Sequence, residues 1–120
     1  MAEATRPPGK TTIAPNVLLT IARLTALDVE GVNQMSEIPG GVNRIFQRGY
    51  EEGVRVRIEG DRVYADLHVI LDRNVNVRDV SRNIQNEVSR AISEMVGMEV
   101  GRVNIHIEDI SYPPEIHKEE

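Results

Sequence analysis

The sequence predicts a two-layer α/β domain of the α+β type, with helices packed on one face of a small mixed or antiparallel sheet. The first observation is compositional: 15 Val and 12 Ile outnumber 6 Leu, and branched aliphatic side chains suit a pleated, half-buried surface. The second is an alternation of apolar and polar residues over 54–71, and the third is a helical apolar stripe over 77–96. Such elements bury their apolar sides by packing one helical layer on one sheet face.

The length of 120 residues indicates one domain. We expect a flexible leader over 1–13, a single α/β domain over 14–111, and an acidic, Pro-containing tail over 112–120. The absence of Cys excludes disulfides, thiolate metal sites, iron–sulfur clusters and a cysteine nucleophile. Apolar runs are too short for direct membrane insertion. Residues from Glu108 onward carry −4 of the net charge of −5, so the net charge says little about the partners of the domain.

The first half of the domain contains a helix followed by short elements. Pro15 suits a first helical turn, and an apolar stripe extends this helix to about Leu27. A short extended piece over 29–35 follows and is broken by Pro39-Gly40-Gly41. The apolar spacing over 42–46 then predicts one or two helical turns, which Gly49 ends.

A β-hairpin is the clearest local prediction. Val54, Val56 and Ile58 alternate with polar residues, and the loop Gly60-Asp61 suits a type II′ turn. Because a slip by one residue would scramble both faces, we expect Ile58 to pair with Val63. On the outward face this register predicts three cross-strand pairs, namely Glu59 with Arg62, Arg57 with Tyr64, and Arg55 with Asp66.

A long helix and a last strand complete the domain. Asn76 is the expected N-cap of a helix over 77–96, and Gly97 is placed to close it. The last strand alternates over 103–108, and Tyr112-Pro113-Pro114 ends regular structure. We expect the two helices to cover an apolar sheet face made of Val54, Val56, Ile58, Val63, Leu67, Val69, Val103, Ile105 and Ile107.

The outward face of the sheet is the most informative polar surface. We predict that it is a protein-contact face formed by Arg55, Arg57, Tyr64, Asp66, His68, Asn104 and His106. If the two histidine strands are neighbours, the rings could approach and form a metal or acid–base cluster with Asp66 or Glu108. Periodicity cannot place the rings within ligand distance, so two solvated sheet residues are the favoured interpretation. We therefore assign no catalytic, cofactor-binding or metal-binding residue.

Enzymatic motifs are absent from the sequence. Carboxylate pairs such as Glu51-Glu52 would point apart in regular structure, and no nucleophile elbow or phosphate-binding Gly-Lys-Ser/Thr occurs. Binding of RNA or the ribosome through the same outward face is the alternative function, because arginines and Tyr64 lie there. Nucleic acid is not favoured, since Glu59, Asp66 and Glu108 interleave with those arginines.

Residues 84–97 (IQNEVSRAISEMVG), followed by Val100 and the strand VNIHI, resemble the alkaline-shock (envelope stress response) proteins of Gram-positive and related bacteria. The helix over 15–26, then Glu30-Gly31-Val32 and Gly53-Val54, occur in the same order as in that family, so the resemblance covers about residues 12–110. The chain departs from it over 72–75 (DRNV), where the family often has Tyr-Gly.

The resemblance implies a non-enzymatic cytoplasmic protein linked to envelope homeostasis and alkaline stress, without cofactor or catalytic residues. It implies an adaptor or self-assembling scaffold that a protein partner, such as an integral-membrane anchor, recruits to the membrane, and that forms homo-oligomers. Iron–sulfur assembly scaffolds have a similar hairpin–helix–strand order, but they need a cysteine that this chain lacks.

Overall fold

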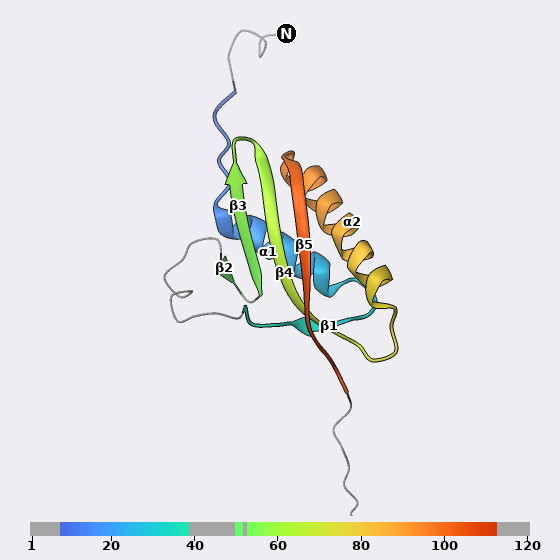
Figure 1. Ribbon diagram of the computed structural model, residues 1–120. Helices are drawn as coiled ribbons and strands as arrows, with labels where there is room; N and C mark the ends of the chain where they lie inside the picture. The colour runs from blue at the N-terminus through green and yellow to red at the C-terminus, as the bar shows by residue number, and fades with distance from the viewer. Residues whose placement is uncertain (1–7, 39–49, 52, 113–120) are drawn as a thin grey trace, which may run out of the picture.

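The computed structural model describes residues 8–38, 50–51 and 53–112, and these form two helices and a five-stranded sheet (Figure 1). Both helices lie on the same side of the sheet, so the predicted two-layer α+β arrangement is confirmed (Figure 1). In chain order the elements are α1 (Pro15–Leu27), β1 (Val32–Met35), β2 (Tyr50–Glu51), β3 (Val54–Glu59), β4 (Arg62–Leu71), α2 (Val77–Val96) and β5 (Glu99–Ile110).

Strand β4 is the centre of the sheet. On one edge it pairs in parallel with β5 along its whole length, from Arg62 to Leu71. On its other edge, β3 pairs antiparallel with the first part of β4 and β1 pairs antiparallel with the last part. Strand β2 lies on the outer side of β3. The sheet is therefore mixed and not antiparallel, whereas the sequence allowed both arrangements.

The predicted hairpin register is confirmed, because Ile58 pairs with Val63 and the whole ladder follows from that pair. One predicted charge contact is wrong. Glu59 does lie opposite Arg62, but its carboxylate contacts Arg57 at 2.8 Å, whereas Arg62 contacts Glu99 at 3.3 Å. The reason is that β5 places Glu99 directly beside Arg62, and a hairpin considered alone does not contain that neighbour.

The core lies between the sheet and the two helices. Helix α1 contributes Leu18, Leu19, Ile21, Ala22 and Ala26, helix α2 contributes Val80, Ile84, Val88 and Ile92, and β4 contributes Val63, Ala65, Leu67, Val69 and Leu71. Ile58 was expected there but is 43% exposed, because it lies at the hairpin end beside Gly60. Val77 and Met95 are exposed as well, because they lie in the first and last turns of α2.

The boundaries of α2 agree with the sequence. The Asn76 side chain accepts a hydrogen bond from the Asp79 backbone N–H at 3.0 Å, and Gly97 closes the helix with a φ of 79°. Strand β1 begins at Val32 and not at residue 29, because Gly31 has a φ of 101° and completes a turn before it. Strand β5 is longer than predicted, and β2 was not predicted.

Some sequence predictions fall on residues that lie outside the described ranges. These are the short helix over 42–46 with its flanking Pro39-Gly40-Gly41, most of the leader, and the tail beyond Tyr112. Neither helix in the described part of the chain has the length and hydropathy that a membrane span requires.

Candidate interaction surface on the open sheet face

The sheet face opposite the helices, called the open face below, carries all the residues that the sequence placed in the contact face. The strand register sets them side by side, with Arg55 next to Asp66 and Arg57 next to Tyr64, and with Asp66 next to Asn104 and His68 next to His106. The structure thus brings together side chains from β3, β4 and β5. Their role in contacting a partner stays a prediction.

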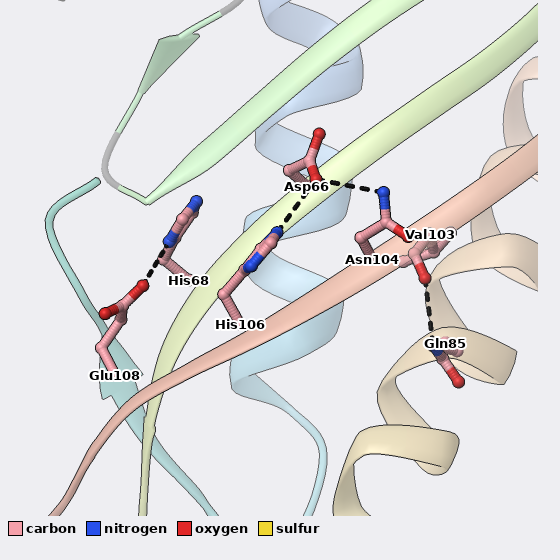
Figure 2. Close-up of polar contacts among 7 residues, drawn as sticks. All are labelled: Asp66, His68, Gln85, Val103, Asn104, His106 and Glu108. Carbon is pink, nitrogen blue, oxygen red and sulfur yellow. Dashed lines mark hydrogen bonds and ion pairs between the residues drawn. The ribbon is translucent and has the colours of Figure 1, made fainter. Parts of the chain in front are cut away.

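His68 and His106 form a stacked pair at the centre of this face. Their ring centroids are 4.4 Å apart and the ring planes are inclined by 12° (Figure 2). His68 is only 8% exposed, so the expectation of two solvated side chains is wrong for this residue. The rings meet because β4 and β5 are parallel neighbours in which these two residues are direct partners, an arrangement that alternation in the sequence cannot show.

Each imidazole also contacts a carboxylate. The Nδ1 atom of His68 lies 2.7 Å from Glu108 Oε2, and the Nε2 atom of His106 lies 3.0 Å from Asp66 Oδ1. Asn104 donates a further hydrogen bond to the same Asp66 oxygen at 3.1 Å. The result is a connected polar row that runs carboxylate, imidazole, imidazole, carboxylate across two strands (Figure 2).

Glu108 is a member of this row that the predicted contact face omitted. The pairing of β4 with β5 shifts between Val69 and Ile70, whose partners are Ile107 and Asp109, so Glu108 is an extra residue at this bulge. The sequence does contain a signal, since the alternation of β5 breaks where two acidic residues, Glu108 and Asp109, follow one another.

The geometry of the row does not converge on a metal ion. In Figure 2 the two carboxylates lie at opposite ends of the stacked rings, and each is engaged by a different imidazole. Over the residues that the structure describes, no group of three or more His, Cys, Asp or Glu side chains could hold a metal ion. The contacts instead hold these side chains in fixed positions on the face.

Asp66 is the electrostatic centre of the row. Partial burial alone would raise its pKa, but hydrogen bonds to His106 and Asn104, together with the charges of His106 and Arg55, outweigh burial and lower the pKa below its ordinary value. The folded state therefore favours the ionised carboxylate. Asp66 stabilises the fold above the pKa it has in the unfolded chain, and this contribution is lost as the pH falls through the lower, folded pKa.

We therefore expect the substitution Asp66→Asn to destabilise the protein more at pH 6 than at pH 3. At pH 6 the variant loses an ionised, hydrogen-bonded carboxylate, whereas near pH 3, below the ordinary pKa of 3.8, the stabilisation by this carboxylate is already reduced in the wild type. Urea unfolding of both proteins at the two pH values measures the difference. An equal loss of unfolding free energy at both values would contradict the lowered pKa of Asp66.

The hairpin end of the open face carries a contact between an arginine and an aromatic ring. The Arg57 guanidinium lies 4.7 Å from the centroid of the Tyr64 ring, as the sequence predicted. Gly101 is a second residue that sequence reasoning missed: a Cβ built there would lie 2.5 Å from the Tyr64 ring. The Tyr64 ring therefore occupies the space where a side chain at position 101 would lie.

Comparison with known proteins finds a family model and relatives that match most of this chain. Residues 3–112 match the model of the alkaline shock protein 23 family, which is described as having a cell envelope-related function. The chain is 34% identical over 105 residues to the uncharacterized protein Spy1535 of Streptococcus pyogenes, with 85% of this chain and 79% of that protein covered. It is 26% identical over 106 residues to the uncharacterized protein YloU of Bacillus subtilis, with 85% and 88% covered.

A solved structure has a similar fold. MamM CTD M250L superposes with a TM-score of 0.50 at 17% sequence identity, and the match covers 78% of this chain and 95% of that chain. At this level of identity the likeness shows the fold alone.

Proposed function

This chain belongs to the alkaline shock protein 23 family, whose function is related to the cell envelope, and we propose that it is a non-enzymatic cytoplasmic adaptor or self-assembling scaffold. In this proposal a protein partner, such as an integral-membrane anchor, recruits it to the membrane during alkaline or general envelope stress. The family match agrees with the resemblance found in the sequence, and the recruitment, the partner and the stress trigger are the proposed parts.

The open face is the observation that best supports an adaptor. Both helices cover the opposite side of the sheet (Figure 1), whereas the open face presents an Arg–Tyr stack and a fixed polar row. Arg and Tyr are enriched in protein–protein interfaces. Because neighbouring strands hold these side chains in place, the face is a preformed surface for a folded partner.

The electrostatics support a role other than acid–base catalysis. A general base works best with a pKa near the operating pH, but the environment of Asp66 lowers the pKa of this carboxyl. The two charged neighbours of Asp66, His106 and Arg55, favour its ionised carboxylate. An ionised carboxylate of lowered pKa is a weak base. The same pairing suits a contact face, since it keeps a negative charge at a fixed point between two basic groups.

Membrane recruitment can be tested with the variant Arg55→Glu/Arg57→Glu. We expect the wild-type protein to co-sediment with native membranes, and the variant to be retained about tenfold less because its open-face charges are reversed. Retention should also be lost when the membranes are treated with protease, and protein-free lipid vesicles should retain neither protein. The measurement is the bound fraction at fixed protein concentration.

The matched control is Arg78→Glu/Arg82→Glu, which makes the same change of charge on exposed positions of α2, on the opposite side of the sheet. This control should bind membranes like the wild type. If the open-face variant binds as well as the control, the open face is not the recruiting surface. If protease-treated membranes still retain the protein, no protein partner recruits it.

Binding of RNA through the same face is the alternative function. On the open face, arginines alternate with the carboxylates of Glu59, Asp66 and Glu108. These carboxylates disfavour binding of the negatively charged phosphate backbone of RNA. RNA affinity that exists at low salt and falls steeply with added salt would support the RNA function instead.

A further inference from the structure

Strand β5 has an outer edge that no other strand covers. Over the residues that the structure describes, β5 pairs with β4 alone. Both backbone groups of His68 bond away from β5, to Gly53 and Ser36 on the opposite edge of β4. Successive residues of a strand direct their backbone groups to opposite edges, so those of Leu67 point to β5.

The register between β4 and β5 identifies the residues that face outward. Leu67 is the partner of Ile105, and in a parallel ladder a residue bonds to the two neighbours of its partner. Asn104 and His106 therefore bond to β4, whereas the N–H and C=O groups of Ile105 point away from the sheet. The same alternation directs outward the backbone groups of Val103 and Ile107.

The two ends of this outer edge are protected, but its middle is not. Gln85 Nε2 donates a hydrogen bond to the Val103 carbonyl at 3.0 Å (Figure 2), and the bulge at Glu108 interrupts the strand at the other end. Between them, the backbone groups of Ile105 and Ile107, called the β5 edge below, have no hydrogen-bond partner in the described part of the chain. Exposed groups of this kind are a template for a further strand.

An extended peptide fits the β5 edge better than a second copy of this chain. Paired strands lie about 4.8 Å apart, whereas packed helices need about 8–10 Å between their axes. Helix α2 lies on the outer side of β5 (Figure 1), and its Gln85 reaches the outward carbonyl of Val103. Two copies joined from β5 to β5 would therefore bring their α2 helices closer than helices can pack. A single extended strand brings no helix with it.

The side chains around the β5 edge define the chemistry of the strand that would fit. Ile105 and Ile107 are half-buried on the helix side of the sheet, so apolar side chains of an added strand would cover them. Glu108, on the open face, and the adjacent Asp109 are exposed. Within the described ranges neither forms an ion pair with an arginine or a lysine. These carboxylates favour basic side chains on the open-face side of the strand.

We propose that the β5 edge binds an extended peptide segment of a protein partner by β-strand addition, and that apolar and basic side chains alternate in this segment. The backbone groups of Ile105 and Ile107 supply the hydrogen bonds, and the side chains set the sequence preference. The inference deepens the proposed function and rests on it for assigning the segment to the recruiting partner. Every second side chain of the segment would lie beside His106, on the open face itself.

Amide hydrogen exchange, followed by NMR, tests whether the β5 edge is free. In the wild type, the N–H groups of Ile105 and Ile107 should exchange at least about 100-fold faster than those of Asn104 and His106, because only the latter two bond to β4. The probe for binding is a short synthetic peptide in which valine and lysine alternate. At saturation it should slow the exchange at Ile105 and Ile107 at least about tenfold.

Modified peptides separate backbone from side-chain recognition. N-methylation of the valines blocks an antiparallel strand at the β5 edge, and N-methylation of the lysines blocks a parallel one. One of these two peptides should therefore bind at least about tenfold more weakly than the parent peptide. Replacing every lysine by glutamate should weaken binding at low salt about as much, because Glu108 and Asp109 would repel the peptide. Calorimetric titration measures the affinities.

The protein variant Ile105→Pro removes one outward N–H, a change that an edge strand tolerates. Its matched control is Ile105→Ala, which also removes the isoleucine side chain but keeps the N–H. We expect Ile105→Ala to bind the peptide at least about tenfold more tightly than Ile105→Pro. Circular dichroism verifies that both variants are folded, and the modified peptides test the same hydrogen bonds on the unaltered protein.

Several results would overturn the proposal. These are a wild type that does not bind the peptide, equal exchange at Ile105 and His106 in the free protein, bound peptide that leaves exchange at Ile105 unchanged, and equal affinities for the parent and both N-methylated peptides. Protection of Ile105 that increases with protein concentration would assign the edge to a second copy instead. Equal binding of the glutamate peptide would contradict the basic character of the segment.

The proposed function fails separately from this inference. If the peptide binds the β5 edge but native membranes do not retain the wild type, only the recruitment is overturned. If native membranes retain Ile105→Pro as well as they retain Ile105→Ala, the segment does not belong to the recruiting partner.

Discussion

Replacing Gly53 by Ala is expected to lower the free energy of unfolding by about 3–5 kcal/mol, a large part of the stability of a small domain. Gly53 has a φ of 84°, a conformation that disfavours any Cβ. A Cβ there would also lie 2.4 Å from the Ser36 carbonyl oxygen and 2.9 Å from that of His68. Both are backbone atoms, so no side chain can move aside to relieve the contact.

The position of Gly53 explains the size of this effect. Its carbonyl accepts the backbone N–H of His68, and the His68 carbonyl accepts the N–H of Ser36. Gly53 therefore lies just before the start of β3, at the point where β1 replaces β3 along the same edge of β4. A side chain at this point would separate the two strands from β4, directly beneath the stacked histidine.

The control is Gly60→Ala in the hairpin loop. Gly60 also has a positive φ, of 66°, but a Cβ there meets no atom within 4 Å. Its cost should be only the backbone term of about 1–2 kcal/mol. Thermal and urea unfolding of the two variants measure the difference. Equal losses would show that the crowding at Gly53 does not contribute to stability.

The second large effect is expected for Ile84→Ala, at about 2–5 kcal/mol. Ile84 is fully buried on the side of α2 that faces the sheet, and its truncation leaves a cavity between the two layers. The rest of the helix is well anchored by its caps and by three other buried side chains. The surroundings therefore have little freedom to collapse into the space.

Met95→Ala, on the same helix, is the matched comparison. Met95 is 70% exposed, so its truncation should change the unfolding free energy by no more than about 0.5 kcal/mol. Chemical denaturation of both variants measures the two losses. If Ile84→Ala also lowers the unfolding free energy by less than about 0.5 kcal/mol, Ile84 does not contribute to the packing of α2 on the sheet.

Local features of the fold could be predicted from the sequence because neighbouring residues determine them. The hairpin register follows from alternation around Gly60-Asp61, and the bounds of α2 follow from a cap at Asn76 and a glycine at position 97. The contact-face residues were assigned to the correct side of the sheet for the same reason, since strand parity is a local property.

Long-range features could not be predicted in the same way. Nothing within β5 shows that it pairs in parallel with β4, and this pairing alone stacks His68 on His106 and places Glu99 beside Arg62. The burial of His68 and the crowding at Gly53 likewise depend on strands that are distant in sequence. The exposure of Val17 and Leu24 on α1 could not be predicted either, because a helical period marks apolar positions without telling which of them the sheet covers.

The central place of β4 has a consequence for binding. Both edges of this strand are hydrogen-bonded, to β5 on one side and to β3 and β1 on the other, and Asp66 and His68 are mounted on it. A partner that docks on the open face would meet a backbone that has already lost its conformational entropy in folding. Little ordering would remain to oppose association, so recognition there would be a rigid-body encounter that charge and shape could make fast and readily reversible.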